Sequence, residues 1–171
     1  MPDTTRILVR NDRDQDIPAV VEIDAEASSP YRTAETPETF QHRLDVVPNG
    51  FFVLVADHEI AAYGCSEKRQ TEQAPGAEEN LPVAHEPDGR ILSIIALGVK
   101  TKYQGRGYRL RVLDKLIEIA HLEGCRKVVV ETMQAQESYQ QRGFQTVRSR
   151  TDGGISSDVM SLELKSISRI P

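Results

Sequence analysis

The sequence predicts one α+β domain built around a mixed β-sheet. Short apolar runs typical of strands alternate with stretches whose apolar residues recur at helical spacing, and several strands read as hairpin partners. One strand-helix-strand crossover adds a parallel pair to these antiparallel strands. The length of 171 residues suits a single hydrophobic core, so we expect one domain over 1–171.

The N-terminal part of the chain predicts two helices among its strands. The second helix is well marked, because Thr36 is a suitable N-cap and Pro37 suits the first helical position. In chain order, the expected elements are a strand over 6–10, helices over 15–27 and 37–46, and a hairpin of strands over 51–57 and 59–69.

An insert over 70–90 separates these elements from the rest of the domain. It is acidic and rich in Pro and Gly, which is typical of a functional or disordered segment. The strand that follows is the most apolar in the chain, so we place it at the centre of the sheet. The later elements are this strand over 91–100, a helix that ends near Gly124, a strand over 127–132, a short helix over 136–142, and closing strands over 144–150 and 158–164.

Composition excludes several classes of function. The net charge is −5 and the basic residues concentrate over 100–111, which argues against broad nucleic-acid binding and favours one local anion site. No apolar run is long enough for a membrane span and no secretory signal is visible, so we expect a cytoplasmic protein. Cys65 and Cys125 lack the spacing of a metal site, and we interpret both as buried thiols.

A glycine-rich turn lies between the central strand and the helix that follows it. Its sequence is Gln104-Gly105-Arg106-Gly107-Tyr108. A strand, a glycine turn and a helix start together aim unpaired backbone N–H groups at one point, which suits a phosphate or pyrophosphate. Leu110 replaces the third glycine of the dinucleotide fingerprint, and no P-loop sequence is present. The alternative is a tight turn with exposed arginines.

The segment LGVKTKYQGRG, over 97–107, resembles the acetyl-CoA-binding segment of the GCN5-related N-acetyltransferases (GNAT). The resemblance implies the GNAT fold, a mixed and mostly antiparallel sheet of about seven strands flanked by about four helices, with central strands that splay at the acetyl-CoA site. It also implies acetyl-CoA as co-substrate and no metal. It assigns pantetheine to Leu97, Gly98 and Val99, and the pyrophosphate to Gln104, Gly105, Arg106, Gly107, Tyr108 and Arg109.

Two further residues matter in this resemblance. Arg109 stands where the family has a small residue, so it either adds a charge to the phosphates or crowds the loop. The segment ESYQQRGF, over 137–144, resembles the family motif that places a tyrosine near the cofactor sulfur. Tyr139 is then the candidate general acid, and a core or surface tyrosine is the alternative.

A narrower resemblance, to the arylalkylamine N-acetyltransferase branch, predicts the acceptor. It rests on the turn of His85, Pro87 and Gly89 and on the segment over 22–44. It implies an arylalkylamine or polyamine acceptor, with Pro30, Tyr31 and Tyr63 as candidate substrate contacts. The two histidines of the vertebrate proton relay are replaced by Ser93 and Ile95, and Ser93 is a candidate to hold a water or simply to bond within its strand. The acidic insert either attracts a cationic amine or is a solvated loop.

Other functions remain open on the sequence. Within the family, the acceptor alternatives are a peptide or ribosomal-protein amine and an antibiotic amine. Outside catalysis, the alternative is an acyl-CoA-binding module, which Arg109 and the missing histidines favour and Tyr139 disfavours. The resemblance also allows a homodimer formed through the closing strands.

Overall fold

The computed structural model describes residues 5–28, 34–71 and 85–165. Within them, one seven-stranded sheet has the order β1-β2-β3-β4-β5-β7-β6. Only β4 and β5 pair in parallel. The strands are β1 (Ile7–Asn11), β2 (Phe51–Ala56), β3 (Glu59–Arg69), β4 (Ile91–Val99), β5 (Lys127–Thr132), β6 (Gln145–Asp152) and β7 (Ile155–Glu163). The predicted α+β class, the mixed sheet and the central position of β4 are confirmed.

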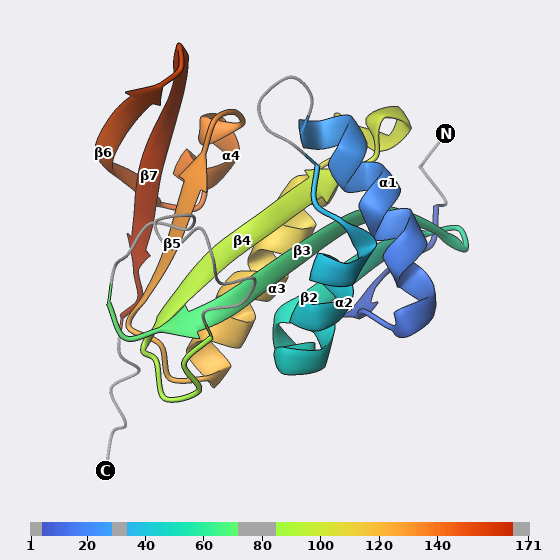
Figure 1. The fold of residues 1–171 in the computed structure, drawn as a ribbon, viewed down its shortest axis with the longest axis horizontal. Helices are drawn as coiled ribbons and strands as arrows, with labels where there is room; N and C mark the ends of the chain where they lie inside the picture. Colours follow the sequence, from blue (N-terminus) through green and yellow to red (C-terminus); the bar gives the residue numbers. More distant parts are fainter. Residues whose placement is uncertain (1–4, 29–33, 72–84, 166–171) are drawn as a thin grey trace.

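Helices cover both faces of the sheet (Figure 1). The α-helices are α1 (Ile17–Ser28), α2 (Pro37–Val46), α3 (Tyr108–Leu122) and α4 (Gln136–Gln140). α1 and α2 pack on one face and α3 packs on the other. Gly64 brings α3 close to β3, because a Cβ at this position would lie 2.6 Å from a methyl carbon of Val112. No helix in the described residues is long and apolar enough to cross a membrane.

Local signals explain where the helices begin. The Thr36 hydroxyl accepts the backbone N–H of Thr39 at 3.2 Å, and Pro37 begins α2, as predicted. α1 begins at Ile17 rather than two residues earlier, because Asp14–Asp16 form a separate 3₁₀ turn. Cys65 and Cys125 are free and buried, in agreement with the prediction, and burial raises the pKa of the Cys65 thiol to about 12.

The sheet opens at its centre. β4 and β5 pair only from Ile91 with Lys127 to Ile94 with Val130, although both strands continue beyond this point. Figure 1 shows the two strands separating toward the end of the sheet where α4 lies. A bulge on the other side of β4, between Cys65 and Ser66, marks the same level. The predicted splayed strands are therefore present.

A buried carboxyl pair at the end of β1 predicts how stability depends on pH. Asp12 is 7% exposed and lies beside Asp16, which binds Arg10 at 2.6 and 3.0 Å. Burial raises the pKa of Asp12 to about 7. The native state therefore holds a proton that the unfolded chain releases above about pH 4, and the free energy of unfolding falls as the pH rises from about 4 to about 7.

We expect the Asp12→Asn variant to be more stable than the unchanged protein at pH 8 and equally stable below about pH 4. The amide removes the buried charge and keeps a donor toward Asp16. Urea unfolding at several pH values measures the difference in the free energy of unfolding between the two proteins. If this difference were the same from about pH 4 to about pH 8, Asp12 would not carry the proton.

Candidate functional site

A groove lies where β4 and β5 separate. It consists of a larger pocket of about 530 Å³ at the glycine-rich turn and a smaller pocket of about 90 Å³ between the two strands. The two pockets share Ala27, Arg109 and Gln134 in their walls. They form adjoining parts of one path that runs from the start of α3 to α4.

The glycine-rich turn has the backbone shape that an anion site requires. Gly105 and Gly107 have φ of +81° and +80°, a region that side chains with a Cβ rarely adopt. Gly107 is the N-cap of α3, and no side chain caps the helix there. The first N–H groups of α3 therefore face the larger pocket without an intrahelical partner. A Cβ on either glycine would meet no atom within 4 Å, so the glycines leave open space in front of these groups.

The lysines before this turn are already paired with a carboxylate. Lys102 lies 2.8 Å from Glu59, and Lys100 and the Tyr103 hydroxyl donate to the same group at 3.0 and 2.5 Å. These partners, Lys102 first, lower the pKa of Glu59 to about 2. The contacts hold the short turn over Thr101–Tyr103 against β3 and leave the arginines of the loop as its unpaired cations within the described residues.

The structure brings most of the predicted cofactor residues to the groove. The larger pocket is lined by six of them, and Leu97 lines the smaller pocket. Gly98 and Arg106 line neither pocket: a Cβ on Gly98 would lie 2.9 Å from the Tyr63 ring, and the Arg106 guanidinium lies 5.3 Å from the Tyr103 ring centre. The lining residues from the prediction are Val99, Gln104, Gly105, Gly107, Tyr108 and Arg109.

Tyr139 lies in the wall of the smaller pocket. It is 3% exposed, and its ring packs edge-on against Phe144 at 5.5 Å between centroids. Ala135, with φ of +64°, precedes α4 and turns the chain so that this helix faces the groove. Burial raises the pKa of the Tyr139 phenol, and the nearby Arg109 guanidinium partly opposes this by charge and hydrogen bonding. The phenol is therefore protonated at neutral pH and has a proton to donate.

Sequence reasoning missed a second polar group in the smaller pocket, Glu131. Its carboxylate accepts hydrogen bonds from Arg150 at 2.6 and 2.8 Å and from the Ser157 hydroxyl at 2.8 Å, and its side chain is 13% exposed. Ile95, one of the positions of the absent histidines, lines the same pocket. The sequence feature that could have indicated Glu131 is that it is the one acidic residue in the apolar strand KVVVET. It lies directly after the last residue of β5 that pairs with β4.

Ser93 lies earlier on β4 and outside both pockets. It is 1% exposed, between Glu67 of β3 and Val129 of β5, and its hydroxyl has no partner among the described residues. Ser93 therefore lies in the paired part of the sheet, before β4 and β5 diverge. Its neighbour Ile94 lines the smaller pocket, and Ser93 itself lines neither pocket of the groove.

The predicted acceptor contacts are not brought together. Tyr63 is 1% exposed in the core between β3 and α1, where its hydroxyl donates to Asp24 at 2.8 Å. Its packing against Phe40 and Phe51 explains why the ring faces inward and not toward the groove. Pro30, Tyr31 and most of the acidic insert lie outside the described residues.

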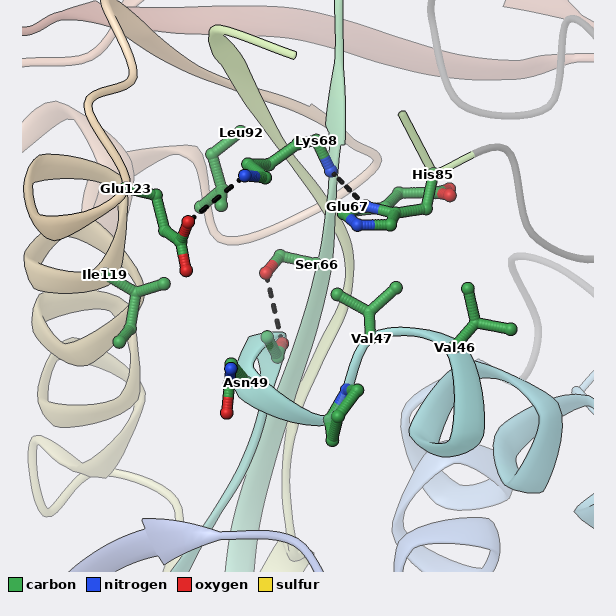
Figure 2. A pocket seen from close by; sticks show the side chains of 12 residues that line it. Val46, Val47, Asn49, Ser66, Glu67, Lys68, His85, Leu92, Ile119 and Glu123 are labelled. Carbon is green, nitrogen blue, oxygen red and sulfur yellow. Dashed lines mark hydrogen bonds and ion pairs between the residues drawn. The ribbon is translucent and has the colours of Figure 1, made fainter. Parts of the chain in front are cut away.

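The turn of His85, Pro87 and Gly89 serves a different part of the molecule. Nδ1 of His85 accepts the backbone N–H of Lys68 at 3.0 Å, and Lys68 pairs with Glu123 of α3 at 3.1 Å (Figure 2). His85 thereby lines a separate pocket of about 120 Å³ that shares no residue with the groove. Gly89 is required for packing, because a Cβ there would lie 2.5 Å from the Arg69 backbone nitrogen.

Comparison with known proteins gives the family. A sequence model of the acetyltransferase (GNAT) family matches residues 17–144, which include the splayed strands, the glycine-rich turn and Tyr139. The chain belongs to this family. A comparison with curated protein sequences finds no significant match for this GNAT protein.

Solved structures agree on the fold of this acetyltransferase. A GNAT-like decarboxylase, GphF, in complex with isobutyryl-CoA has a TM-score of 0.81 and 15% identity, over 92% of this chain and 100% of the other. The acetyltransferase yncA from Salmonella typhimurium, with its cofactor acetyl-CoA, has a TM-score of 0.72 and 15% identity, over 97% and 98%. The ribosomal-protein-S18-alanine N-acetyltransferase from Escherichia coli has a TM-score of 0.70 and 16% identity, over 96% and 97%.

Proposed function

We propose that this GNAT protein transfers the acetyl group of acetyl-CoA to a primary amine of a small acceptor, an arylalkylamine or a polyamine. The observation that supports this most is the continuous groove, which has an anion-binding helix start at one end and a buried phenol at the other. The branch resemblance of the segments over 22–44 and 84–99 supports the class of acceptor.

The residues present fit acetyl-CoA. Gly105 and Gly107 leave a cradle that any Cβ would fill, so the N–H groups of the loop and of the α3 N-terminus would hold the pyrophosphate. Leu97 and Val99, at the end of β4, line the path between this cradle and Tyr139 and would contact pantetheine. The unpaired edge of β4 offers backbone donors and acceptors along the same path.

The proposed chemistry uses Glu131 and Tyr139, which both lie in the wall of the smaller pocket. When bound, acetyl-CoA supplies an activated thioester. Glu131 accepts the proton that the attacking amine loses as its nitrogen bonds to the carbonyl carbon. Tyr139 donates its proton to the sulfur as the carbon–sulfur bond breaks. Glu131 replaces the missing histidines in this account, and the groove contributes by orienting the two reactants.

We expect the Glu131→Gln variant to lower kcat/KM for the amine about tenfold, less than the hundredfold or more typical of a dedicated base. The smaller effect follows because Arg150 and the Ser157 hydroxyl already donate hydrogen bonds to the carboxylate oxygens, which leaves fewer lone pairs for the amine proton. Thiol release at saturating acetyl-CoA measures the change. The matched control is Glu163→Gln, which removes an exposed carboxylate from the far end of the sheet. Equal activity in both variants would remove Glu131 from the mechanism.

The acceptor is tested with purified protein, acetyl-CoA and a panel of arylalkylamines, polyamines, aminoglycoside antibiotics and short peptides with free α-amines. Thiol release, with mass spectrometry of the acetylated product, reports turnover. The proposal expects the highest kcat/KM with an arylalkylamine or a polyamine. Highest turnover with a peptide or an antibiotic would replace the proposed acceptor, and acetyl-CoA binding without turnover on any amine would favour a binding module.

We also propose a cytoplasmic location and a homodimer. The free, buried thiols of Cys65 and Cys125 suit a reducing compartment. β6 is an edge strand of the sheet and carries Val147, which is 53% exposed, so it offers an apolar surface to a second copy.

A further inference from the structure

Arg109 is a half-buried cation in the groove that pairs with no carboxylate in the described part of the chain. Within the described residues, the other arginines that are buried or half-buried each have a carboxylate partner, and so does the exposed Arg150. These pairs are Arg10 with Asp16, Arg43 with Glu35, Arg69 with Glu67, Arg142 with Asp114, and Arg150 with Glu131. A cation in the wall of a cavity that lacks such a partner is expected to meet an anionic ligand.

The position of the guanidinium indicates which part of the ligand it meets. The sequence led us to expect Arg109 at the phosphates, beside the loop. The structure instead extends its side chain from the first turn of α3 through the larger pocket into the smaller one, where it lies beside the Tyr139 hydroxyl. Tyr139 is the proposed proton donor to the sulfur, so the guanidinium lies at the acyl end of the groove.

The charges around the smaller pocket leave this cation uncompensated. Glu131 is the acidic residue in its wall, and Arg150 already neutralises that carboxylate from the strands behind it. An acetyl group offers no charge to Arg109. A carboxylate would complete the site, because the planar guanidinium binds two carboxylate oxygens at once.

The volume of the smaller pocket limits the length of the acyl chain. It encloses about 90 Å³, less than a fifth of the volume of the larger pocket. A short acyl chain is therefore favoured over a long one.

We propose that Arg109 binds a carboxylate on the acyl group, so that the preferred donor is the CoA thioester of a short dicarboxylic acid, such as malonyl-CoA or succinyl-CoA. The inference rests on the proposed function, since it uses the same groove and the same transfer to an amine. The carboxylate stays on the acyl group throughout, and acetyl-CoA acts as a weaker donor.

Calorimetric titration of the purified protein with malonyl-CoA, succinyl-CoA and acetyl-CoA tests this. We expect malonyl-CoA to bind at least about tenfold more tightly than acetyl-CoA, the gain typical of one charge-assisted contact. The Arg109→Gln variant should lose the preference for malonyl-CoA. Arg109→Lys, which keeps the positive charge but not the planar guanidinium, should retain part of this preference. The matched control is Arg111→Gln, which changes an exposed arginine two residues further along α3.

Several outcomes would overturn the inference. Equal affinity for the three thioesters in the unchanged protein would do so, and so would a preference that survives in Arg109→Gln. If Arg109→Gln weakens the binding of all three thioesters equally, Arg109 is a phosphate ligand. A loss of kcat with unchanged affinities would make it a stabiliser of the departing thiolate. If no CoA thioester binds the unchanged protein, the proposed function itself fails. Thermal unfolding of each variant confirms that it is folded.

Discussion

Replacing Gly107 with alanine is expected to weaken acetyl-CoA binding about 10–100-fold while the protein remains folded. The added Cβ would stand in front of the α3 N-terminus and hold the pyrophosphate away from one or two backbone N–H groups. Each lost hydrogen bond to a charged group is worth about 1.5–3 kcal/mol. Isothermal titration calorimetry with acetyl-CoA measures the affinity.

Gly124→Ala is the matched control for this substitution. Gly124 also has a positive φ, +73°, and also meets open space, but it lies exposed after the last turn of the same helix. Both variants therefore pay a similar backbone strain of about 1–2 kcal/mol. If the two variants bind acetyl-CoA equally well, the pyrophosphate does not lie at the start of α3.

Replacing Tyr139 with phenylalanine is expected to lower kcat about 10²–10³-fold, within the range of general acid catalysis. The aromatic contact with Phe144 and the burial of the ring are kept, so the affinity for acetyl-CoA and the thermal stability should change little. Steady-state kinetics and calorimetry on the same preparation separate the two effects. A variant with full activity would assign Tyr139 to the core.

The pH profile of the unchanged enzyme supplies a second test of the phenol. Burial raises the pKa of Tyr139 above its ordinary value of about 10, so the proton donor remains protonated across the physiological range. We therefore expect kcat to show no decline with rising pH until above about pH 10. A decline nearer neutrality that is absent in Tyr139→Phe would mean that the phenol ionises more easily than its burial implies.

The parts of this protein that the sequence predicts are those set by local chemistry. Thr36 and Pro37 mark the start of α2 because capping depends on neighbouring residues. Gly105 and Gly107 mark the loop because few other residues adopt its positive φ. The motif around Tyr139 predicts a short helix for a similar reason, since α4 and the turn before it are contiguous in the chain.

The parts that the sequence missed depend on contacts between distant segments. Glu131 reads as an isolated acid, and its partners Arg150 and Ser157 reach it only because β7 pairs with β5 and β6 pairs with β7. Tyr63 was expected at the acceptor, but strand alternation does not reveal that α1 covers that face and offers Asp24 to its hydroxyl. The direction of the long Arg109 side chain depends on the space between β4 and β5.

The splay of β4 and β5 connects the fold to the proposed chemistry. Pairing ends at Ile94 and Val130, so the backbone of β4 beyond this point is available to a ligand. The same separation creates the smaller pocket, beside Tyr139 of α4, and this pocket adjoins the larger one at the glycine-rich turn and the start of α3. A substitution that closed this gap would remove the proposed cofactor path and the proposed acid together.

A crystal structure of the acetyl-CoA complex would measure the distance from the cofactor sulfur to the Tyr139 hydroxyl oxygen, on which the proposed mechanism depends. We expect a distance of about 3–4 Å, within hydrogen-bonding range for sulfur, with the pyrophosphate at the turn of Gly105 and Gly107. A cofactor that lies outside the gap between β4 and β5, or whose sulfur lies far from Tyr139, would contradict it.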